Sequence, residues 1–112
     1  MPSAAAAGSA VTYHLIRQAI TDRCCLTGSY DGRIRHFAPH AIGQGEDGQA
    51  NVLAFQYAGQ SMTDLPPGGE WRCFRVDGLS GVRRNDDRWH SRRNYSRRPH
   101  SCVARIDIAV PM

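Results

Sequence analysis

The sequence contains no lysine: all fourteen of its basic residues are arginine. Against ten acidic residues, they give a formal net charge of +4. A guanidinium group binds phosphate through two parallel hydrogen bonds and stacks on bases, whereas an ammonium group does both less well. The composition therefore favours an anionic partner, although net charge carries no information about the fold.

The chain also lacks any apolar run near the ~20 residues that a membrane-spanning helix needs, so we expect no membrane partner. Residues 1–10 have neither the basic start nor the long apolar stretch of a secretory signal. They are rich in alanine and serine and have nothing large to bury, which predicts a disordered lead-in. Residues 11–112 then suffice for one domain with a single modest core.

The four cysteines form no C-x-x-C pair and match no zinc-binding spacing, so we expect neither a metal nor another cofactor. Without an export signal, reduced thiols and a cytoplasmic location are the expectation. Cys24, Cys25 and Cys73 are predicted to be small residues of the core.

Hydrophobic periodicity predicts one helix followed by five or six strands. Thr12 can cap a helix over residues 12–22, and the apolar stripe of this helix has to pack on the rest of the chain. We expect Pro39 to end the second strand or to lie at an edge, and the glycines of 43–48 to mark a loop. The alternating patterns predict strands at 24–30, 33–39, 51–57, 71–76, 79–84 and 103–110.

This order of elements is typical of a mostly β (α+β) fold. The strands are short, and both faces of the strand at 51–57 are apolar, which places that strand in the middle of a sheet. We therefore predict a small SH3-like or Sm-like barrel of five to six strands, with the helix over one opening.

The dipeptide Asp31-Gly32 between two strand-like runs favours a two-residue type I′ turn. Such a turn fixes the register of the hairpin, and side chains alternate between the faces of a strand. One face is then apolar at its far end and carries an aromatic ring and two arginines near the turn, as at the mouth of a barrel. The expected facing pairs are Tyr30 with Arg33, Gly28 with Arg35, and Leu26 with Phe37.

Several short motifs follow one another between about residues 15 and 82. They are Leu15, Ala19 and Ile20 on the leading helix, a strand tyrosine at Tyr30, an R-x-x-x-P step at Arg35 and Pro39, and the block Arg72, Phe74, Val76, Asp77 and Leu79. In order and spacing this region resembles the WYL domain of bacterial transcriptional regulators. The resemblance is that of a divergent member, because only Leu53 matches the Trp-Tyr-Leu step and Gly78 stands where a basic residue is expected.

The resemblance implies an Sm-like or SH3-like barrel that binds nucleic acid or a nucleotide and takes part in transcription regulation. WYL domains usually follow a winged-helix DNA-binding domain, and residues 1–10 are too short for one. The chain therefore resembles a stand-alone WYL-like module. The resemblance does not extend to the arginine-rich stretch at 83–98 or to the last strand.

Four arginines, one tyrosine and one histidine are the candidates for a ligand site. Charge-assisted contacts to phosphate would come from the arginines, with a stacking face from the tyrosine. A histidine just after Pro39 would sit where a loop leaves the sheet and could donate to the same ligand. The alternative is a solvated strand surface with ion pairs to Asp31, Asp77 or Glu70, or a hydrogen-bonded surface histidine. The candidates are Tyr30, Arg33, Arg35, His40, Arg72 and Arg75.

Arg72 and Arg75 are three residues apart on one strand. Because side chains alternate between the two faces, these arginines point to opposite faces. Arg72 and Arg35 carry the family-like positions, and we expect these two arginines to converge. Arg75 is the weaker candidate.

The stretch 83–98 holds seven arginines without periodicity and is predicted to be a loop or an extended tail. Arg83, Arg84, Arg92 and Arg93 are the candidates for contact with a nucleic-acid backbone, while Trp89 and Tyr95 could stack on single-stranded bases. The alternative is an exposed basic loop with only non-specific affinity.

The five histidines are scattered and form no triad with a serine or cysteine, so we expect no enzymatic activity. The main prediction is a module that binds single-stranded nucleic acid or a nucleotide in a regulatory role. The alternative is a protein-interaction or self-association module, as a homodimer or with a transcription-related partner, that uses exposed sheet edges or the proline-rich loop.

Overall fold

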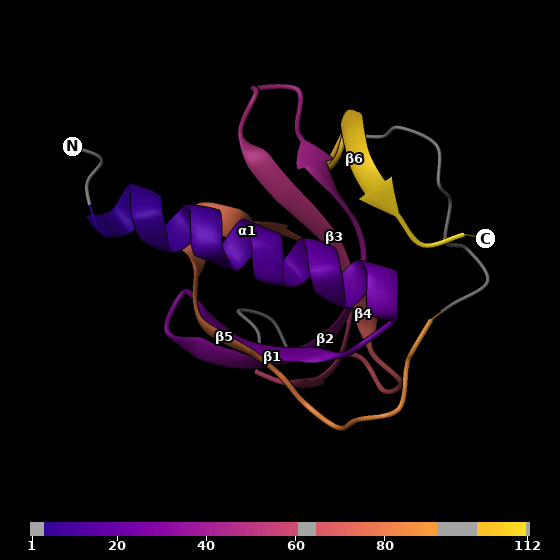
Figure 1. Ribbon diagram of the computed structural model, residues 1–112. Helices are drawn as coiled ribbons and strands as arrows, with labels where there is room; N and C mark the ends of the chain where they lie inside the picture. Colours follow the sequence, from indigo (N-terminus) through magenta and orange to yellow (C-terminus); the bar gives the residue numbers. More distant parts are fainter. Residues whose placement is uncertain (1–3, 61–64, 92–100, 112) are drawn as a thin grey trace.

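The computed structural model describes residues 4–60, 65–91 and 101–111, which form one helix and six antiparallel strands (Figure 1). The prediction of a mostly β chain with a leading helix is confirmed. The elements are α1 (Ala4–Asp22), β1 (Leu26–Tyr30), β2 (Arg33–Gln44), β3 (Ala50–Gly59), β4 (Glu70–Arg75), the 3-10 turn η1 (Val76–Gly78), β5 (Leu79–Arg84) and β6 (Arg105–Ala109).

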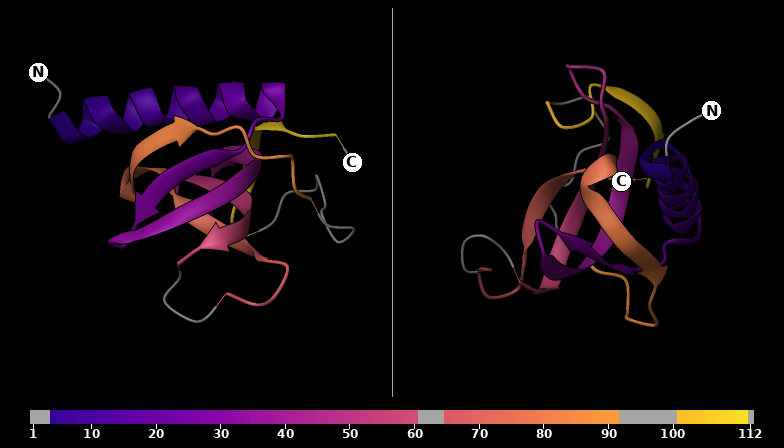
Figure 2. Two further views of the ribbon diagram at one scale, coloured as in Figure 1. Left: turned by 90° about the horizontal axis from the view of Figure 1, so that it is seen from below. Right: turned by 90° about the vertical axis from the view of Figure 1, so that its left-hand side faces the viewer.

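The helix begins earlier than predicted. Residues 4–10, expected to be part of a disordered lead-in, belong to α1, and Thr12 lies inside the helix instead of capping it. Alanine has the highest helix propensity of all residues, which favours helix over the run Ala4–Ala7. The first turns of α1 reach beyond the strands that the rest of the helix crosses (Figure 2, left). Residues 1–3 lie outside the described part of the chain.

The strands follow the order β4-β3-β2-β1-β5, and β6 pairs with the far half of β2. As predicted, β3 is central, because it lies between β2 and β4. Within the described residues, no pairing joins β4 to β5, so the sheet is open and the predicted barrel closure is not confirmed.

The hairpin of β1 and β2 has the predicted turn and register. Asp31 and Gly32 have φ angles of 53° and 72°, the positive values that a type I′ turn requires at both central positions. The predicted facing pairs are all present: Tyr30 with Arg33, Gly28 with Arg35, and Leu26 with Phe37.

Pro39 neither ends the second strand nor lies at an edge. Strand β2 runs through it to Gln44, and Gly43, which was assigned to a loop, is part of the strand. On one side of β2, pairing with β1 stops at Phe37 and pairing with β6 starts at Ala41. Pro39 occupies this gap next to a bulge, where its missing N–H costs no ladder hydrogen bond.

The main core lies between α1 and one face of the sheet, which we call the inner face. Alternation within each strand and the cluster of buried side chains define its members. The helix contributes the predicted apolar stripe, with Ile16, Ala19 and Ile20 buried. The strands contribute Leu26, Phe37, Ile42, Val52, Ala54 and Phe74.

A second, smaller group, the outer cluster, consists of Phe55, Trp71, His40 and Tyr57 with Trp89 and His90. The rings of Phe55 and Trp71 are 5.3 Å apart, and Tyr57 stacks on His90 at 4.0 Å. The segment 85–91, predicted to be a loop, has no regular secondary structure but is held against the sheet through this cluster.

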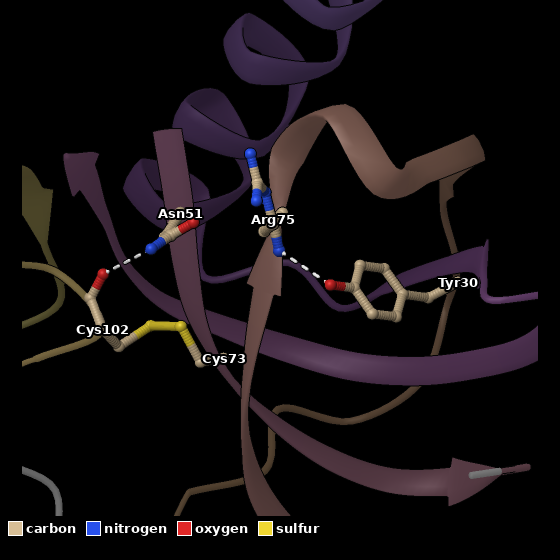
Figure 3. The surroundings of a disulfide bond; sticks show 5 residues. All are labelled: Tyr30, Asn51, Cys73, Arg75 and Cys102. Carbon is tan, nitrogen blue, oxygen red and sulfur yellow. Dashed lines mark hydrogen bonds between the residues drawn. A yellow bond between two sulfur atoms is a disulfide. The ribbon is translucent and has the colours of Figure 1, made fainter. Parts of the chain in front are cut away.

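The prediction of reduced thiols is wrong for two of the four cysteines. Cys73 is exposed rather than part of the core, and it forms a disulfide with Cys102. The carbonyl of Cys102 also accepts a hydrogen bond from the Asn51 side chain (Figure 3). The disulfide ties β4 to the chain just before β6. Cys24 and Cys25 are free thiols. Disulfides persist mainly in oxidising compartments, so the argument from thiols for a cytoplasmic location no longer holds.

Candidate anion-binding site

Arg35 is a buried cation on the inner face. Arg35 is 4% exposed, and its guanidinium carbon lies 5.6 Å from the ring centre of Phe74 and 5.7 Å from that of Tyr30. Nη1 donates to Oε1 of Gln56 at 3.1 Å, and Nη2 donates to the carbonyl of Tyr30 at 3.4 Å. The third nitrogen, Nε, is buried and has no acceptor.

Arg72 approaches the same region from β4. It precedes Phe74 by two residues and therefore points to the same face as that ring. Its Nη2 lies 2.8 Å from Oε2 of Glu70, but at an angle that leaves the nitrogen without a hydrogen bond. We take this contact as a close ion pair without hydrogen-bond geometry. Nε of Arg72 is also buried without an acceptor. Together Arg35 and Arg72 hold three buried donor nitrogens that have no hydrogen-bond acceptor among the described residues.

The electrostatics of this arginine pair are unfavourable in the absence of an anion. Burial lowers the pKa of Arg35 from its ordinary value, and the positive charges of Arg72 and then Arg33 lower it further. None of the ion pairs among the described residues involves Arg35. Burying charge without a partner is costly, so an anion between these guanidinium groups would relieve both the desolvation and the repulsion.

Tyr30 lies beside the pair but its ring is packed. The ring is 4.9 Å from that of Phe74, and a Cβ added at Gly78 would come within 2.9 Å of it. The hydroxyl accepts a hydrogen bond from the backbone N–H of Arg75 at 3.3 Å (Figure 3). The Tyr30 ring is therefore half-buried and packs against Phe74, and its predicted stacking on a ligand stays a prediction.

Arg33 and Arg75 lie at the margins. The Arg33 side chain donates to the carbonyl of Asp31 at the hairpin tip. Arg75 points to the opposite face from Arg72, as its parity predicted, and its half-exposed side chain lies 3.5 Å from Asp77. The alternative of ion pairs with Glu70 and Asp77 is thus confirmed for Arg72 and Arg75 respectively.

His40 is far from solvent and does not lie at a loop. It is a fully buried residue within β2, with its ring 4.7 Å from Trp71 and 4.8 Å from Trp89. Nδ1 lies 2.8 Å from the carbonyl of Ala38, which can only accept, so Nδ1 carries the proton and Nε2 accepts from the hydroxyl of Ser91. Burial lowers the pKa of His40 to about 4. The imidazole is therefore neutral at pH 7 and belongs to the outer cluster.

The arginines expected to track a nucleic-acid backbone are only partly placed. Arg83 donates to the carbonyl of Gly81, and Arg84 forms an ion pair with Asp22 at 2.6 Å. Trp89, predicted as a stacking platform, packs on His40. Arg92, Arg93 and Tyr95 lie outside the described residues.

Gln56 is a site residue that the sequence analysis missed. It is fully buried, its Oε1 accepts from Arg35, and its Nε2 donates to the carbonyls of Ala58 and Gln60. A glutamine inside an apolar strand was the available signal, because a buried amide needs partners for every one of its polar atoms.

A groove of about 390 Å³ lies elsewhere, between the first half of α1, the start of β3 and η1. It is lined by Tyr13, Ala50, Val76 and Asp77 among others, and none of the predicted site residues borders it. No three histidine, cysteine, aspartate or glutamate side chains of the described residues gather as they would around a metal ion. Among the same residues, no helix has both the length and the apolar character required to cross a membrane.

The chain matches no protein-family model, no curated protein and no solved structure. Its function therefore has to be argued from the geometry of the arginine pair.

Proposed function

We propose that this chain is a non-enzymatic module that binds a phosphate-bearing ligand at Arg35 and Arg72. The observation that carries the proposal is the set of three buried guanidinium nitrogens without acceptors. Buried polar groups are nearly always hydrogen-bonded, and exceptions call for an explanation such as a missing ligand. A phosphate group offers several acceptor oxygens and negative charge, which suits two guanidinium groups better than a neutral ligand does.

A nucleotide fits these contacts better than a polymer tracked along its backbone. The rings that were expected to stack on bases, Tyr30 and Trp89, are packed against the protein, and Arg84 is paired with Asp22. The remaining candidates are therefore a mononucleotide or the end of a single strand. Both ligands would bind through a phosphate group, and the dependence of affinity on ligand length distinguishes the mononucleotide from the strand end.

The proposal includes a divergent WYL-like module with an SH3-like or Sm-like architecture in a regulatory role. The strand order, with β5 beside β1 and a 3-10 turn between β4 and β5, supports a bent sheet of that kind. Arg35 and Arg72, the two arginines at family-like positions, lie on the same face of the sheet, which supports their assignment as ligand-binding residues.

The test is calorimetric titration of the oxidised protein with AMP, adenosine, inorganic phosphate and single-stranded oligonucleotides with or without a terminal phosphate, over a salt series. We expect AMP and inorganic phosphate to bind and adenosine to fail. Arg72→Gln should weaken binding at least about tenfold, because a hydrogen bond to a charged group contributes about 1.5–3 kcal/mol. Arg35→Lys keeps the charge but loses the planar fork, and should also weaken binding.

Arg75→Gln is the matched control. It removes the same charge from the same strand on the opposite face, and we expect less than a twofold change in affinity. Equal losses in Arg72→Gln and Arg75→Gln would reduce the effect to net charge and overturn the assigned site. Affinity for oligonucleotides that exceeds that for AMP and grows with length would favour a polymer. If no phosphate compound binds but the protein self-associates independently of salt, the protein-interaction alternative takes over.

A further inference from the structure

The arginine pair is already partly occupied by a carboxylate of the chain itself. We propose that Glu70 holds the pair in a closed, ligand-free state and that the terminal phosphate of the ligand displaces it. This inference rests on the proposed function and specifies both the class of ligand and the regulation of the same site.

The position of Glu70 follows from the register of three neighbouring strands. Glu70 is the first residue of β4 and faces Gln56 of β3, while Gln56 binds Arg35 of β2. Two residues along β4, and therefore on the same face, lies Arg72. Arg35, Gln56, Glu70 and Arg72 thus form one polar strip across the sheet, with a single anionic member.

The contact that Glu70 makes is close but incomplete. Its Oε2 is 2.8 Å from Nη2 of Arg72 without hydrogen-bond geometry, and none of the ion pairs among the described residues joins it to Arg35. The Glu70 side chain is 45% exposed, so water can solvate the carboxylate once it rotates away. The ion pair is only partly buried, because the Glu70 side chain reaches solvent, and a ligand that fills the unpaired donors as well can replace it.

The burial of the donors selects how a ligand enters. Nε of both arginines and Nη2 of Arg72 are closed to solvent, and the carboxylate that lies against Nη2, that of Glu70, reaches it as the tip of a side chain. A terminal phosphate can enter in the same end-on manner and carries about −1.5 to −2 charges at pH 7. A phosphodiester has one charge and substituents on two sides, so it can neither match the charge nor reach the buried nitrogens end-on.

The experiment compares Glu70→Gln with Asp77→Asn by titration with AMP and with cyclic AMP, a phosphodiester. Both substitutions remove one carboxylate that pairs with an arginine of β4, but Asp77 pairs with Arg75 on the opposite face. We expect Glu70→Gln to raise the affinity for AMP about 3- to 10-fold, because the internal competitor is gone. Asp77→Asn should change the affinity less than twofold, and cyclic AMP should bind wild type at least about tenfold more weakly than AMP.

The outcomes separate this inference from the proposed function. If Arg72→Gln loses AMP binding but Glu70→Gln leaves it unchanged, the closed state is wrong while the anion site stands. Equal gains in Glu70→Gln and Asp77→Asn would assign the effect to net charge and overturn the role of Glu70. Tight binding of cyclic AMP would overturn the terminal-phosphate class. If neither wild type nor Glu70→Gln binds any phosphate, the proposed function fails together with the inference. Circular dichroism and urea unfolding check that each variant is folded.

Discussion

The inner face and the outer cluster both bury polar side chains, but they satisfy them differently. In the outer cluster both ring nitrogens of His40 have partners, and the hydroxyl of Tyr57 is bonded to Asp87 and Asn85. On the inner face Arg35 and Arg72 keep three nitrogens without an acceptor. The buried polar groups of the outer cluster named here are hydrogen-bonded, whereas the unbonded nitrogens of Arg35 and Arg72 are the basis of the proposed ligand site.

The difference has a simple structural origin. The outer cluster is covered by the segment 85–91, in which Ser91 bonds to Nε2 of His40 and Asp87 accepts from the hydroxyl of Tyr57. The inner face is covered by the apolar stripe of α1, and neither this stripe nor the neighbouring rings of Phe37 and Phe74 offer an acceptor to a guanidinium group. Five substitutions or conditions test this contrast.

The largest effect is expected from truncation of the core beneath the arginine pair. Phe37 is fully buried and its ring lies 5.2 Å from that of Phe74. Phe37→Ala should lower the free energy of unfolding by about 3–5 kcal/mol, through the loss of burial and the cavity that remains. Urea denaturation measures it. A loss below about 1 kcal/mol would mean that the inner face is not the principal core.

Removing the disulfide should have the next largest effect. The bond between Cys73 and Cys102 closes a loop of 29 residues in sequence separation, and the chain-entropy model gives about 3–4 kcal/mol for such a loop. The double variant Cys73→Ala/Cys102→Ala should lose this amount in urea and become insensitive to reductant. Cys24→Ala, at a free thiol, is the control and should retain the reductant sensitivity of wild type.

Acid should destabilise the outer cluster through His40. Its pKa is lowered to about 4 in the folded protein from the ordinary histidine value of 6.5, so the unfolded chain binds a proton that the folded one excludes. This difference contributes about 3 kcal/mol to the free energy of unfolding. The contribution is fully present above pH 6.5 and is lost as the pH falls towards 4. Urea midpoints across this range should fall in wild type.

His40→Gln should flatten that part of the profile. The carboxyls of Asp22 and Asp107 do not confuse the readout, because hydrogen bonds from their partners lower their pKa values from 3.8 and their contributions are lost only at still lower pH. A variant with the wild-type pH profile would show that His40 is not the titrating group.

A smaller loss is expected where one hydrogen bond of the outer cluster is deleted. Tyr57→Phe removes the hydroxyl that donates to Asp87 and accepts from Asn85. We expect about 1 kcal/mol lower stability, since a typical hydrogen bond contributes about that much. Thermal or urea unfolding measures it. An unchanged stability would mean that the bonding of the outer cluster does not contribute to the fold.

The smallest effect on stability, and the sharpest contrast with Tyr57→Phe, is expected at Arg72. Arg72→Met removes unfilled donors and repulsion with Arg35 while keeping an unbranched apolar stem. The stability should stay within about 1 kcal/mol of wild type or rise, since replacing a poorly satisfied buried charge is often neutral or stabilising. The same variant should lose phosphate binding. A large loss of stability would assign Arg72 to the fold and contradict the contrast.

The sequence by itself determined the local elements of this protein. Asp31-Gly32 fixed the turn and, through the two-residue period of strands, the register that puts Arg35 opposite Gly28. Strand β5 starts and ends where the alternation predicted, and the apolar stripe of α1 faces the core. Each of these features depends on neighbours within a few residues, which a sequence pattern records directly.

Only the tertiary structure decided which distant residues meet. It paired Cys73 with Cys102, buried His40 against Trp71 and Trp89, and placed Gln56 against Arg35. It also carried Pro39 into the middle of a strand, because β1 and β6 leave a gap beside it. Whether a buried donor finds a hydrogen-bond acceptor depends on side chains from several strands at once, and a local sequence pattern does not record which of these side chains meet.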